Sequence, residues 1–208
     1  MPPILSWNHG SRGTTHLWRI DESHDYFLTK LTDSGIDLQV IDGWHPERQR
    51  EWLAGRHLIQ EYINHPLLNL QISDQTGKPY FPGVGDYFSL SHSGRYVALA
   101  CSSVFVGCDI QIYSKTLERI QRKFCSPSEI EQVRQSVQSI DPLHLIWTAK
   151  EAMYKALGQR GVRFREDITL DLDKEAGEIL HGGMSHQFDV HHYQLHELTV
   201  ALSWIHID

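Results

Sequence analysis

Residues 141–158, DPLHLIWTAKEAMYKALG, predict a helix that packs into a protein core. Asp141 suits the N-cap position, because its carboxylate can accept a hydrogen bond from a free backbone N–H of the first turn. Pro142 follows at the first helical position, where a missing N–H costs nothing. Gly158 ends the segment, since glycine is the residue best suited to a left-handed C-terminal cap.

The predicted helix carries a lysine on its apolar side. At about 100° per residue, six apolar residues fall on one arc: Leu143, Ile146, Ala149, Met153, Ala156 and Leu157. Lys150 lies inside this arc, flanked by Trp147 and Tyr154. Burying an ammonium group is costly unless an anion meets it. The sequence therefore predicts an anionic partner for Lys150.

Glu151 and Lys155 lie one turn apart along the edge of the same arc. A carboxylate and two lysines beside aromatic side chains indicate a site that handles both a cation and a phosphate. The remaining ligands of such a site would come from other parts of the chain.

The composition is that of a globular protein with a substantial core. The chain has 208 residues, of which 40% are hydrophobic and 22% charged, which suits one large domain or two small ones. It has no apolar run of about 18 residues that would span a membrane. The first residues, MPPILSWNHGSRG, do not resemble a signal peptide. Three cysteines without a CxxC pair indicate reduced thiols and a cytoplasmic protein.

The net charge of −7 argues against a general nucleic-acid-binding protein. Basic residues are nevertheless concentrated in two runs: Lys115, Arg119, Arg122 and Lys123, then Arg160, Arg163 and Arg165. Solvated helix and loop faces explain these runs as well as a binding surface does. The chain has 14 histidines, but the densest group has neither HExxH nor zinc-finger spacing. We expect surface or strand histidines there, not a metal site.

Hydrophobic periodicity and turn residues predict the other elements. In the first half we expect strands at 15–20, 68–72, 87–91 and 95–102, and helices at 26–31 and 46–64. In the second half we expect a strand at 104–112, helices at 117–124 and 127–137, and strands around 168–172, 187–192 and 198–204. The segments YVALACS (96–102) and TVALSWI (199–205) are loosely alike, which indicates two similar halves.

Two segments place polar groups within apolar surroundings. Residues 91–94, SHSG, interrupt two strand-like runs and predict a turn that can point hydroxyls, N–H groups and an imidazole at a phosphate. Asp109 lies in an apolar strand-like run, VFVGCDIQI, where a charged residue needs a partner or a metal.

If Asp109 and Glu151 meet, the two carboxylates form a site suited to Mg²⁺, which is completed by waters and substrate phosphates. The two helix lysines would face these phosphates, and Ser91 with His92 would add donors. Such a set fits cleavage of a pyrophosphate bond, with a carboxylate accepting the proton of an attacking hydroxyl. The residues alone therefore predict Mg²⁺-dependent chemistry on a diphosphate.

Two motifs, VGCDI (106–110) and WTAKEAMYK (147–155), are preceded by GKPYF (77–81) and SLSHSG (89–94). Together they resemble the 4′-phosphopantetheinyl transferase superfamily, in its larger, surfactin-synthetase-activating branch. The resemblance covers roughly residues 48–164. It implies an α/β (α+β) fold of two similar halves, each a helix-packed, mainly antiparallel sheet, related by a pseudo-two-fold axis.

The resemblance implies transfer of the 4′-phosphopantetheine arm of coenzyme A to a serine of an apo acyl or peptidyl carrier protein, with release of adenosine 3′,5′-bisphosphate. It assigns contacts with the coenzyme A nucleotide to residues 1–103, and the Mg²⁺-binding and catalytic motifs to residues 104–208. Two fused halves make a monomer the simplest expectation. Neither nucleic acid nor a membrane is an expected partner.

Individual roles follow from matched motif positions. Asp109 matches a metal-binding aspartate, Glu151 a glutamate that binds the metal and acts as a base, and Lys155 a lysine near the pyrophosphate. The other positions expected to contact coenzyme A are Lys78, Ser91, His92, Lys150, Arg48 and Arg56. The positions expected on the carrier-protein side, within or next to KFCSPSE (123–129), are Arg122, Lys123 and Glu129. The basic run from Lys115 to Lys123 would meet an acidic carrier.

Gln111 departs from the family pattern, since many relatives of this branch have a second acid at this position. An amide oxygen or a water can still complete a Mg²⁺ site. Asp109 and Gln111 alternate on one strand face, so Gln111 should point toward the site. We therefore expect a metal site of Asp109, Glu151 and Gln111, with one negative charge fewer.

Three other interpretations stay open. In the first, the protein binds a ligand without catalysis, and Asp109 and Lys150 form an internal, structural ion pair. Because of Gln111, a degenerate relative would bind coenzyme A or a carrier without transfer. A metal-dependent, pyrophosphate-cleaving hydrolase that uses the histidines would act independently of coenzyme A. Cys108 is disfavoured as a nucleophile, because it alternates away from Asp109.

Overall fold

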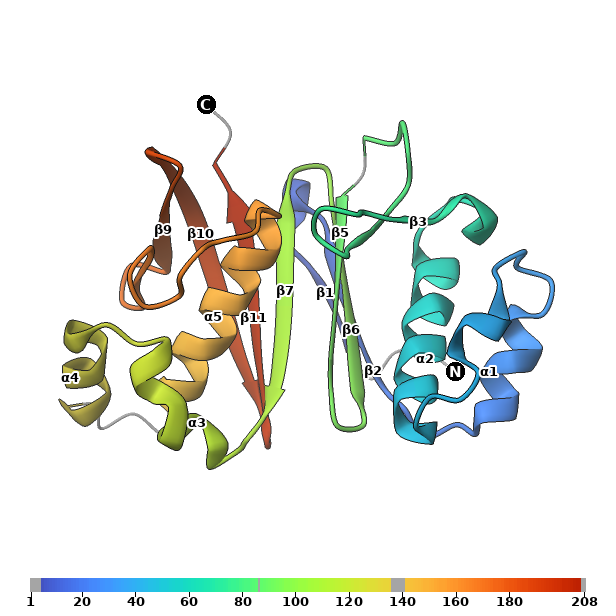
Figure 1. Ribbon diagram of the computed structural model, residues 1–208, viewed down its shortest axis with the longest axis horizontal. Coiled ribbons are helices and arrows are strands. Elements are labelled where there is room, and N and C mark those ends of the chain that lie inside the picture. The colour runs from blue at the N-terminus through green and yellow to red at the C-terminus, as the bar shows by residue number, and fades with distance from the viewer. Residues whose placement is uncertain (1–4, 86, 136–140, 207–208) are drawn as a thin grey trace. The chain divides into compact units, whose positions relative to one another are not determined.

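Figure 1 shows the computed structural model of the protein, which describes residues 5–85, 87–135 and 141–206. The chain divides into two compact units, Met1–Ser103 and Val104–Asp208, which we call the N-terminal unit and the C-terminal unit. Each unit combines helices with an antiparallel sheet, which confirms the predicted α/β (α+β) class. The pseudo-two-fold axis stays a prediction. Within the described ranges, no helix has the length and apolar character needed to cross a membrane.

The N-terminal unit is built on a four-stranded antiparallel sheet in the order β1-β2-β6-β5. Its strands are β1 (Leu5–Asn8), β2 (Thr14–Arg19), β5 (Tyr87–Ser93) and β6 (Tyr96–Ser102), and its helices are α1 (His24–Leu31) and α2 (Pro46–Tyr62). Three 3-10 turns (Gly10–Arg12, Leu38–Ile41, Leu67–Asn69) and a hairpin of β3 (Gln71–Ile72) and β4 (Pro79–Tyr80) complete it. Leu53 and Leu58 of α2 share a buried core with Val97 and Leu99 of β6.

The C-terminal unit is built on a five-stranded antiparallel sheet in the order β7-β11-β10-β9-β8. Its strands are β7 (Val106–Ile112), β8 (Ile168–Asp171), β9 (Ala176–His181), β10 (Met184–Leu195) and β11 (Leu198–Ile205). Its helices are α3 (Thr116–Ile120), α4 (Pro127–Gln135) and α5 (Pro142–Leu157), with a 3-10 turn at Gln121–Lys123. In Figure 1, α5 lies across the sheet, and its Ile146 and Met153 share a buried core with Ile179 and Phe188.

Helix α5 has both predicted caps. The Asp141 side chain accepts a hydrogen bond from the Leu143 N–H at 2.9 Å, which satisfies one of the free donors of the first turn. Gly158 ends the helix in the left-handed conformation, at φ 66° and ψ 28°, where glycine carries no steric penalty. The two ends of the helix are therefore determined by residues local to them.

Strand β7 approaches α5 very closely at Gly107. A Cβ atom at this position would collide with the backbone carbonyl of Ala152 and lie 2.6 Å from the Ala156 nitrogen. Only glycine on the strand, facing small residues on the helix, permits this distance. The contact brings the next residues of β7 on the same face, Asp109 and Gln111, alongside the helix.

The two units share a topological feature. In each unit, the strand that precedes the helices pairs with the last strand, as β2 pairs with β6 and β7 pairs with β11. The segment YVALACS is β6, and TVALSWI lies in β11. The similar segments thus occupy corresponding places in two helix-and-sheet units.

The structure corrects three details of the predicted elements. Of residues 68–72, Leu68 and Asn69 belong to a 3-10 turn and only Gln71–Ile72 form a strand, and strands β1, β4 and β9 were not predicted. Ser91 and His92 continue strand β5, where they pair with Ala98 and Val97, so they do not belong to a turn. The end of the helix expected at 127–137 lies outside the described residues.

Candidate active site

Asp109 of β7 and Lys155 of α5 form an ion pair in the C-terminal unit. The Lys155 Nζ donates to Asp109 Oδ1 at 2.7 Å and to the Cys108 carbonyl oxygen at 3.0 Å. Asp109 is almost fully buried, so this cation offsets part of the cost of its charge. The pair that Asp109 makes is with Lys155, and the interpretation of an Asp109–Lys150 pair is wrong.

Glu151 lies on α5 one turn before Lys155. Burial raises the pKa of Glu151 to about 7; the Asp109 carboxylate raises it as well, and the Lys155 ammonium acts against both. Two carboxylates and one lysine therefore meet where β7 contacts α5. This arrangement carries a repulsion between Glu151 and Asp109 that a cation would relieve.

Gln111 completes this side of β7. Its Nε2 donates to the Ile112 carbonyl oxygen at 3.0 Å, and among the described residues its Oε1 has no hydrogen-bond partner. The side-chain amide thus keeps its oxygen available as a ligand. No group of three or more histidine, cysteine or carboxylate side chains able to hold a metal occurs in the described ranges. A metal at this place would have two carboxylates, an amide oxygen and positions left for water or phosphate, which fits Mg²⁺.

Lys150 does not reach this site. Its ammonium is fully buried and donates to three oxygens: Phe124 O at 2.8 Å, Glu129 Oε2 at 2.7 Å and Phe164 O at 2.9 Å. An ammonium has three N–H donors, so none is left for a phosphate. The predicted anionic partner exists, but the prediction that Lys150 contacts coenzyme A is wrong for this reason.

The structure also corrects the expected position of Glu129 on the carrier-protein side. Its carboxylate is buried beside Lys150, and it also accepts from the Ser126 N–H at 2.7 Å, while the Ser126 Oγ accepts from the Glu129 N–H at 3.2 Å. This reciprocal pair is a capping box at the start of α4. A buried Glu129 cannot touch a carrier protein directly.

Arg122 and Lys123 of the same segment are exposed, and Arg165 donates to the Arg122 carbonyl oxygen at 3.2 Å.

Four other predicted residues line one pocket of the N-terminal unit, of about 170 Å³. These are Arg48 and Arg56 of α2, with Ser91 and His92 of β5. Burial lowers the pKa of Arg56 to about 10, which still leaves the guanidinium charged at neutral pH. Lys78 lies apart from these residues in the β3–β4 hairpin and does not line the pocket.

The arginines of this pocket rest on tryptophans. Arg48 lies 4.7 Å from the ring centre of Trp44, and Arg56 lies 4.3 Å from that of Trp52. Arg48, Trp52 and Arg56 follow one another at intervals of four along α2, the spacing that aligns side chains along a helix face. Trp44 precedes the helix, so helical spacing in the sequence does not indicate its contact with Arg48. His92 also pairs with Glu51, its Nδ1 lying 3.3 Å from Glu51 Oε2.

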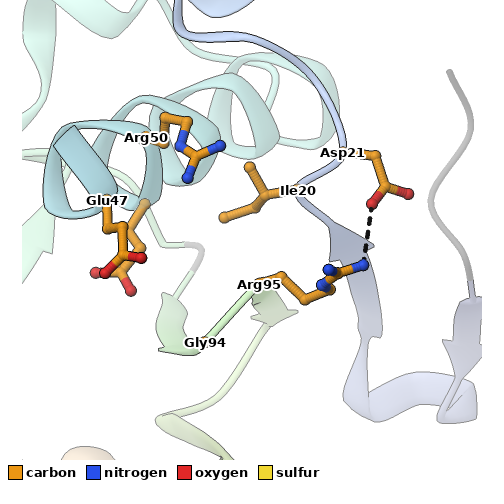
Figure 2. Close-up of a pocket in the computed structure, with 7 residues that line it drawn as sticks. Ile20, Asp21, Glu47, Arg50, Gly94 and Arg95 are labelled. Carbon is orange, nitrogen blue, oxygen red and sulfur yellow. Dashed lines mark ion pairs between the residues drawn. The ribbon is translucent and has the colours of Figure 1, made fainter.

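A second polar pocket of the N-terminal unit, about 480 Å³, shares Glu51 with the first. Figure 2 shows Glu47 and Arg50 of α2 on one side of it, and Asp21 and Arg95 on the other. Arg95 Nη1 lies 3.7 Å from Asp21 Oδ1. The sequence prediction missed this pocket, because its charged residues come from three separated segments.

Two carboxylates and a lysine at the contact of a helix with an antiparallel sheet are a set of groups that metal-assisted phosphoryl chemistry could use. Residues 105–203 match the family model of the 4′-phosphopantetheinyl transferase superfamily. The chain is 33% identical over 175 residues to the 4′-phosphopantetheinyl transferase AcpT of Escherichia coli (strain K12), covering 81% of this chain and 80% of that protein. The chain therefore belongs to the 4′-phosphopantetheinyl transferase superfamily and is an enzyme of this class.

Two further relatives agree with this assignment. The 4′-phosphopantetheinyl transferase AcpT of Salmonella typhimurium is 36% identical over 131 residues, 60% of this chain and 65% of that protein. The 4′-phosphopantetheinyl transferase Sfp of Bacillus subtilis (strain 168) is 28% identical over 124 residues, 56% of this chain and 55% of that protein. The resemblance seen in the sequence motifs is confirmed.

Proposed function

We propose that this enzyme transfers the 4′-phosphopantetheine arm of coenzyme A to a serine of an apo acyl or peptidyl carrier protein. The serine oxygen forms a new bond to the phosphorus that carries the pantetheine arm. The pyrophosphate P–O bond breaks, adenosine 3′,5′-bisphosphate leaves, and the proton of the serine hydroxyl passes to a base. Atoms and charges balance without any further reactant.

The observation that carries the proposal is the meeting of Asp109, Glu151 and Lys155 at the contact between β7 and α5. The carboxylates of Asp109 and Glu151, with the amide oxygen of Gln111, would hold Mg²⁺. Mg²⁺ held there would supply positive charge to offset the negative charge of the pyrophosphate as it is cleaved. Lys155 is held against Asp109 and the Cys108 carbonyl, and its positive charge would stabilise the same phosphates.

Glu151 is our candidate for the base that accepts the serine proton. In the metal-free site, burial raises the pKa of Glu151 to about 7, which makes its carboxylate a better proton acceptor than an ordinary glutamate. Asp109 is occupied by Lys155, which makes it the less suitable acceptor. Because Gln111 is neutral, Glu151 would serve both as a ligand and as the base.

We assign the nucleotide end of coenzyme A to the N-terminal unit. The pocket lined by Arg48, Arg56, Ser91 and His92 offers two guanidinium groups, a hydroxyl and an imidazole to a phosphate. Lys78 is kept as a separate proposed contact on its motif position alone. The exposed Arg122 and Lys123 are the proposed meeting point with an acidic carrier protein.

The test is transfer in solution. The purified enzyme, Mg²⁺ and coenzyme A are incubated with a panel of apo carriers from fatty acid, polyketide and peptide synthesis, and each carrier is weighed by intact-mass spectrometry. We expect a gain of one phosphopantetheine group on at least one carrier, and no gain when its serine is replaced by alanine. An unmodified panel would overturn the proposal.

Two controls separate the remaining interpretations. Breakdown of coenzyme A without a carrier would indicate a hydrolase. Calorimetric binding of coenzyme A without any transfer would indicate a degenerate relative. Chelation of Mg²⁺ with EDTA should stop transfer, and activity unaffected by EDTA would contradict the metal assignment.

A further inference from the structure

The Lys150–Glu129 pair ties three separate segments to one point of α5. The Lys150 ammonium donates hydrogen bonds to the carbonyl oxygen of Phe124 at the end of the 3-10 turn, to the carboxylate of Glu129 in the first turn of α4, and to the carbonyl oxygen of Phe164 in the loop after α5. Glu129 is itself fixed by the Ser126 N–H. The geometry of the pair therefore leaves little freedom to either side chain.

Aromatic side chains close over this pair. The Trp147 ring lies 4.9 Å from that of Phe124 and 5.8 Å from that of Phe164, and the rings of Phe164 and Tyr154 are 5.4 Å apart. Buried pairs of this kind add little stability over apolar residues of the same size, but they demand one geometry. A role in placing α5 is therefore a better account of the pair than stability alone.

Glu151, the next residue, depends on α5 for its position. Its carboxylate makes no hydrogen bond to any described residue, so only the helix backbone and packing hold it in place. Lys150 ties α5 to the α3–α4 side, whereas Lys155 ties it to β7 (Figure 1). Glu151 thus lies between two attachments that act on opposite sides of one helix.

We infer that Lys150, held by Glu129, is a positioning residue that sets α5 so that Glu151 faces Asp109. This inference rests on the proposed roles of Glu151 and Asp109. It assigns Lys150 no contact with coenzyme A. It also gives the buried Glu129 a function in the enzyme other than contact with the carrier.

The experiment removes the pair without leaving an unpaired charge. In Lys150→Met combined with Glu129→Gln, methionine fills the space of the lysine stem, and glutamine keeps the capping box. We expect the midpoint of urea unfolding to return close to that of the wild type, whereas Lys150→Met alone lowers it by leaving Glu129 unpaired. The double variant therefore separates the effect of the pair on the position of α5 from its effect on the stability of the protein.

In the double variant, kcat should fall by about 10- to 100-fold, the usual effect of losing a group that orients a metal ligand. The KM for coenzyme A should stay within about twofold, because no phosphate contact is lost. Recovery of kcat together with stability would reduce the pair to a structural role and overturn the inference. A raised KM for coenzyme A with unchanged kcat would also overturn the inference, because it would indicate that Lys150 does contact a phosphate of coenzyme A.

Calorimetric titration with Mg²⁺ alone gives a readout that does not need turnover. We expect the affinity of the double variant for Mg²⁺ to fall by about tenfold or more, and an unchanged affinity would contradict the inference. If the wild type proves inactive on all carriers, the proposed function fails, but this titration still tests the positioning of Glu151. Lys174→Met, which breaks an exposed pair with Asp171 of equal length, 2.7 Å, is the matched control and should change neither value.

Discussion

The two lysine–carboxylate pairs of α5 have the same length and opposite surroundings. The N–O distance is 2.7 Å in both Lys150–Glu129 and Lys155–Asp109. The side chains of the first pair are 0% and 4% exposed, and those of the second 22% and 9%. Distance alone therefore says little about what an ion pair does.

The difference lies in what else each pair can bind. All three N–H donors of Lys150 bond to oxygens inside the protein, so the Lys150–Glu129 pair has no donor left for a ligand. Lys155 and Asp109 lie next to Glu151, whose pKa is raised by burial and then by Asp109. The second pair therefore belongs to a site with excess negative charge, which a metal and a phosphate can complete. The following predictions test this contrast, from the largest effect to the smallest.

Loss of either carboxylate beside Lys155 should have the largest effect. We expect Asp109→Ala and Glu151→Ala each to lower kcat/KM by about 10²- to 10⁴-fold, because each removes a proposed metal ligand and Glu151 is also the candidate base. Rates come from the intact-mass assay, with circular dichroism to verify folding. Asp171→Asn, at an exposed pair, is the control. Near-normal turnover in either alanine variant would refute the metal assignment.

The two lysines should fail in different ways. Lys150→Met should lower the free energy of unfolding by about 3–5 kcal/mol, because it leaves a buried carboxylate unpaired. Lys155→Met also leaves a buried carboxylate, Asp109, without its cation, but Lys155 is 22% exposed, so water can reach the pair and the loss should be smaller, about 1–3 kcal/mol. It should in addition lower kcat by about 10²-fold. Urea unfolding and the transfer assay measure the two quantities. Equal losses of stability would remove the contrast between the pairs.

The raised pKa of Glu151 predicts a pH-dependent stability in metal-free enzyme. The carboxyl titrates at about 4.5 when unfolded and about 7 when folded, so the folded state binds more protons between these values. Stability from this group is therefore present below about pH 4.5 and is lost as the pH rises to about 7. Urea unfolding with EDTA at pH 5 and pH 8 should show a smaller decrease for Glu151→Gln than for the wild type. The exposed Glu131→Gln should behave like the wild type, and an equal decrease in all three proteins would contradict the assigned pKa.

The smallest effect is expected at Gln111. Gln111→Glu adds a carboxylate beside Asp109 and should raise the affinity for Mg²⁺ by a few-fold, with little change in kcat. Calorimetry with Mg²⁺ measures the affinity, with the exposed Gln187→Glu as control. A titration identical to that of the wild type would mean that Gln111 does not touch the metal.

The sequence predicted those features of α5 that depend on neighbouring residues. The caps at Asp141 and Gly158, like the capping box of Ser126 and Glu129, require only groups a few residues apart. The need for an anion beside Lys150 also followed from its place on the apolar arc. These features are set locally, so the sequence contains them directly.

The identity of that anion did not follow from the sequence. Glu129 lies 21 residues before Lys150, so no local pattern links the two. In the sequence, a phosphate meets the need of Lys150 for an anion equally well. Ser91 and His92 were misplaced for a similar reason, because their strand is extended by pairing with β6, which no local pattern reports. Gly107 was available as a signal, since a glycine inside a strand often marks a close backbone approach.

The contact at Gly107 sets a limit on redesign of the protein. Since even a methyl group there would strike the Ala152 carbonyl, the strand that bears Asp109 and the helix that bears Glu151 cannot be varied independently. Libraries aimed at the proposed carrier contact should leave residue 107 and the facing alanines untouched and diversify the exposed residues around Arg122 and Lys123. The contact of Gly107 with Ala152 and Ala156 determines how closely β7, which bears Asp109, approaches α5, which bears Glu151.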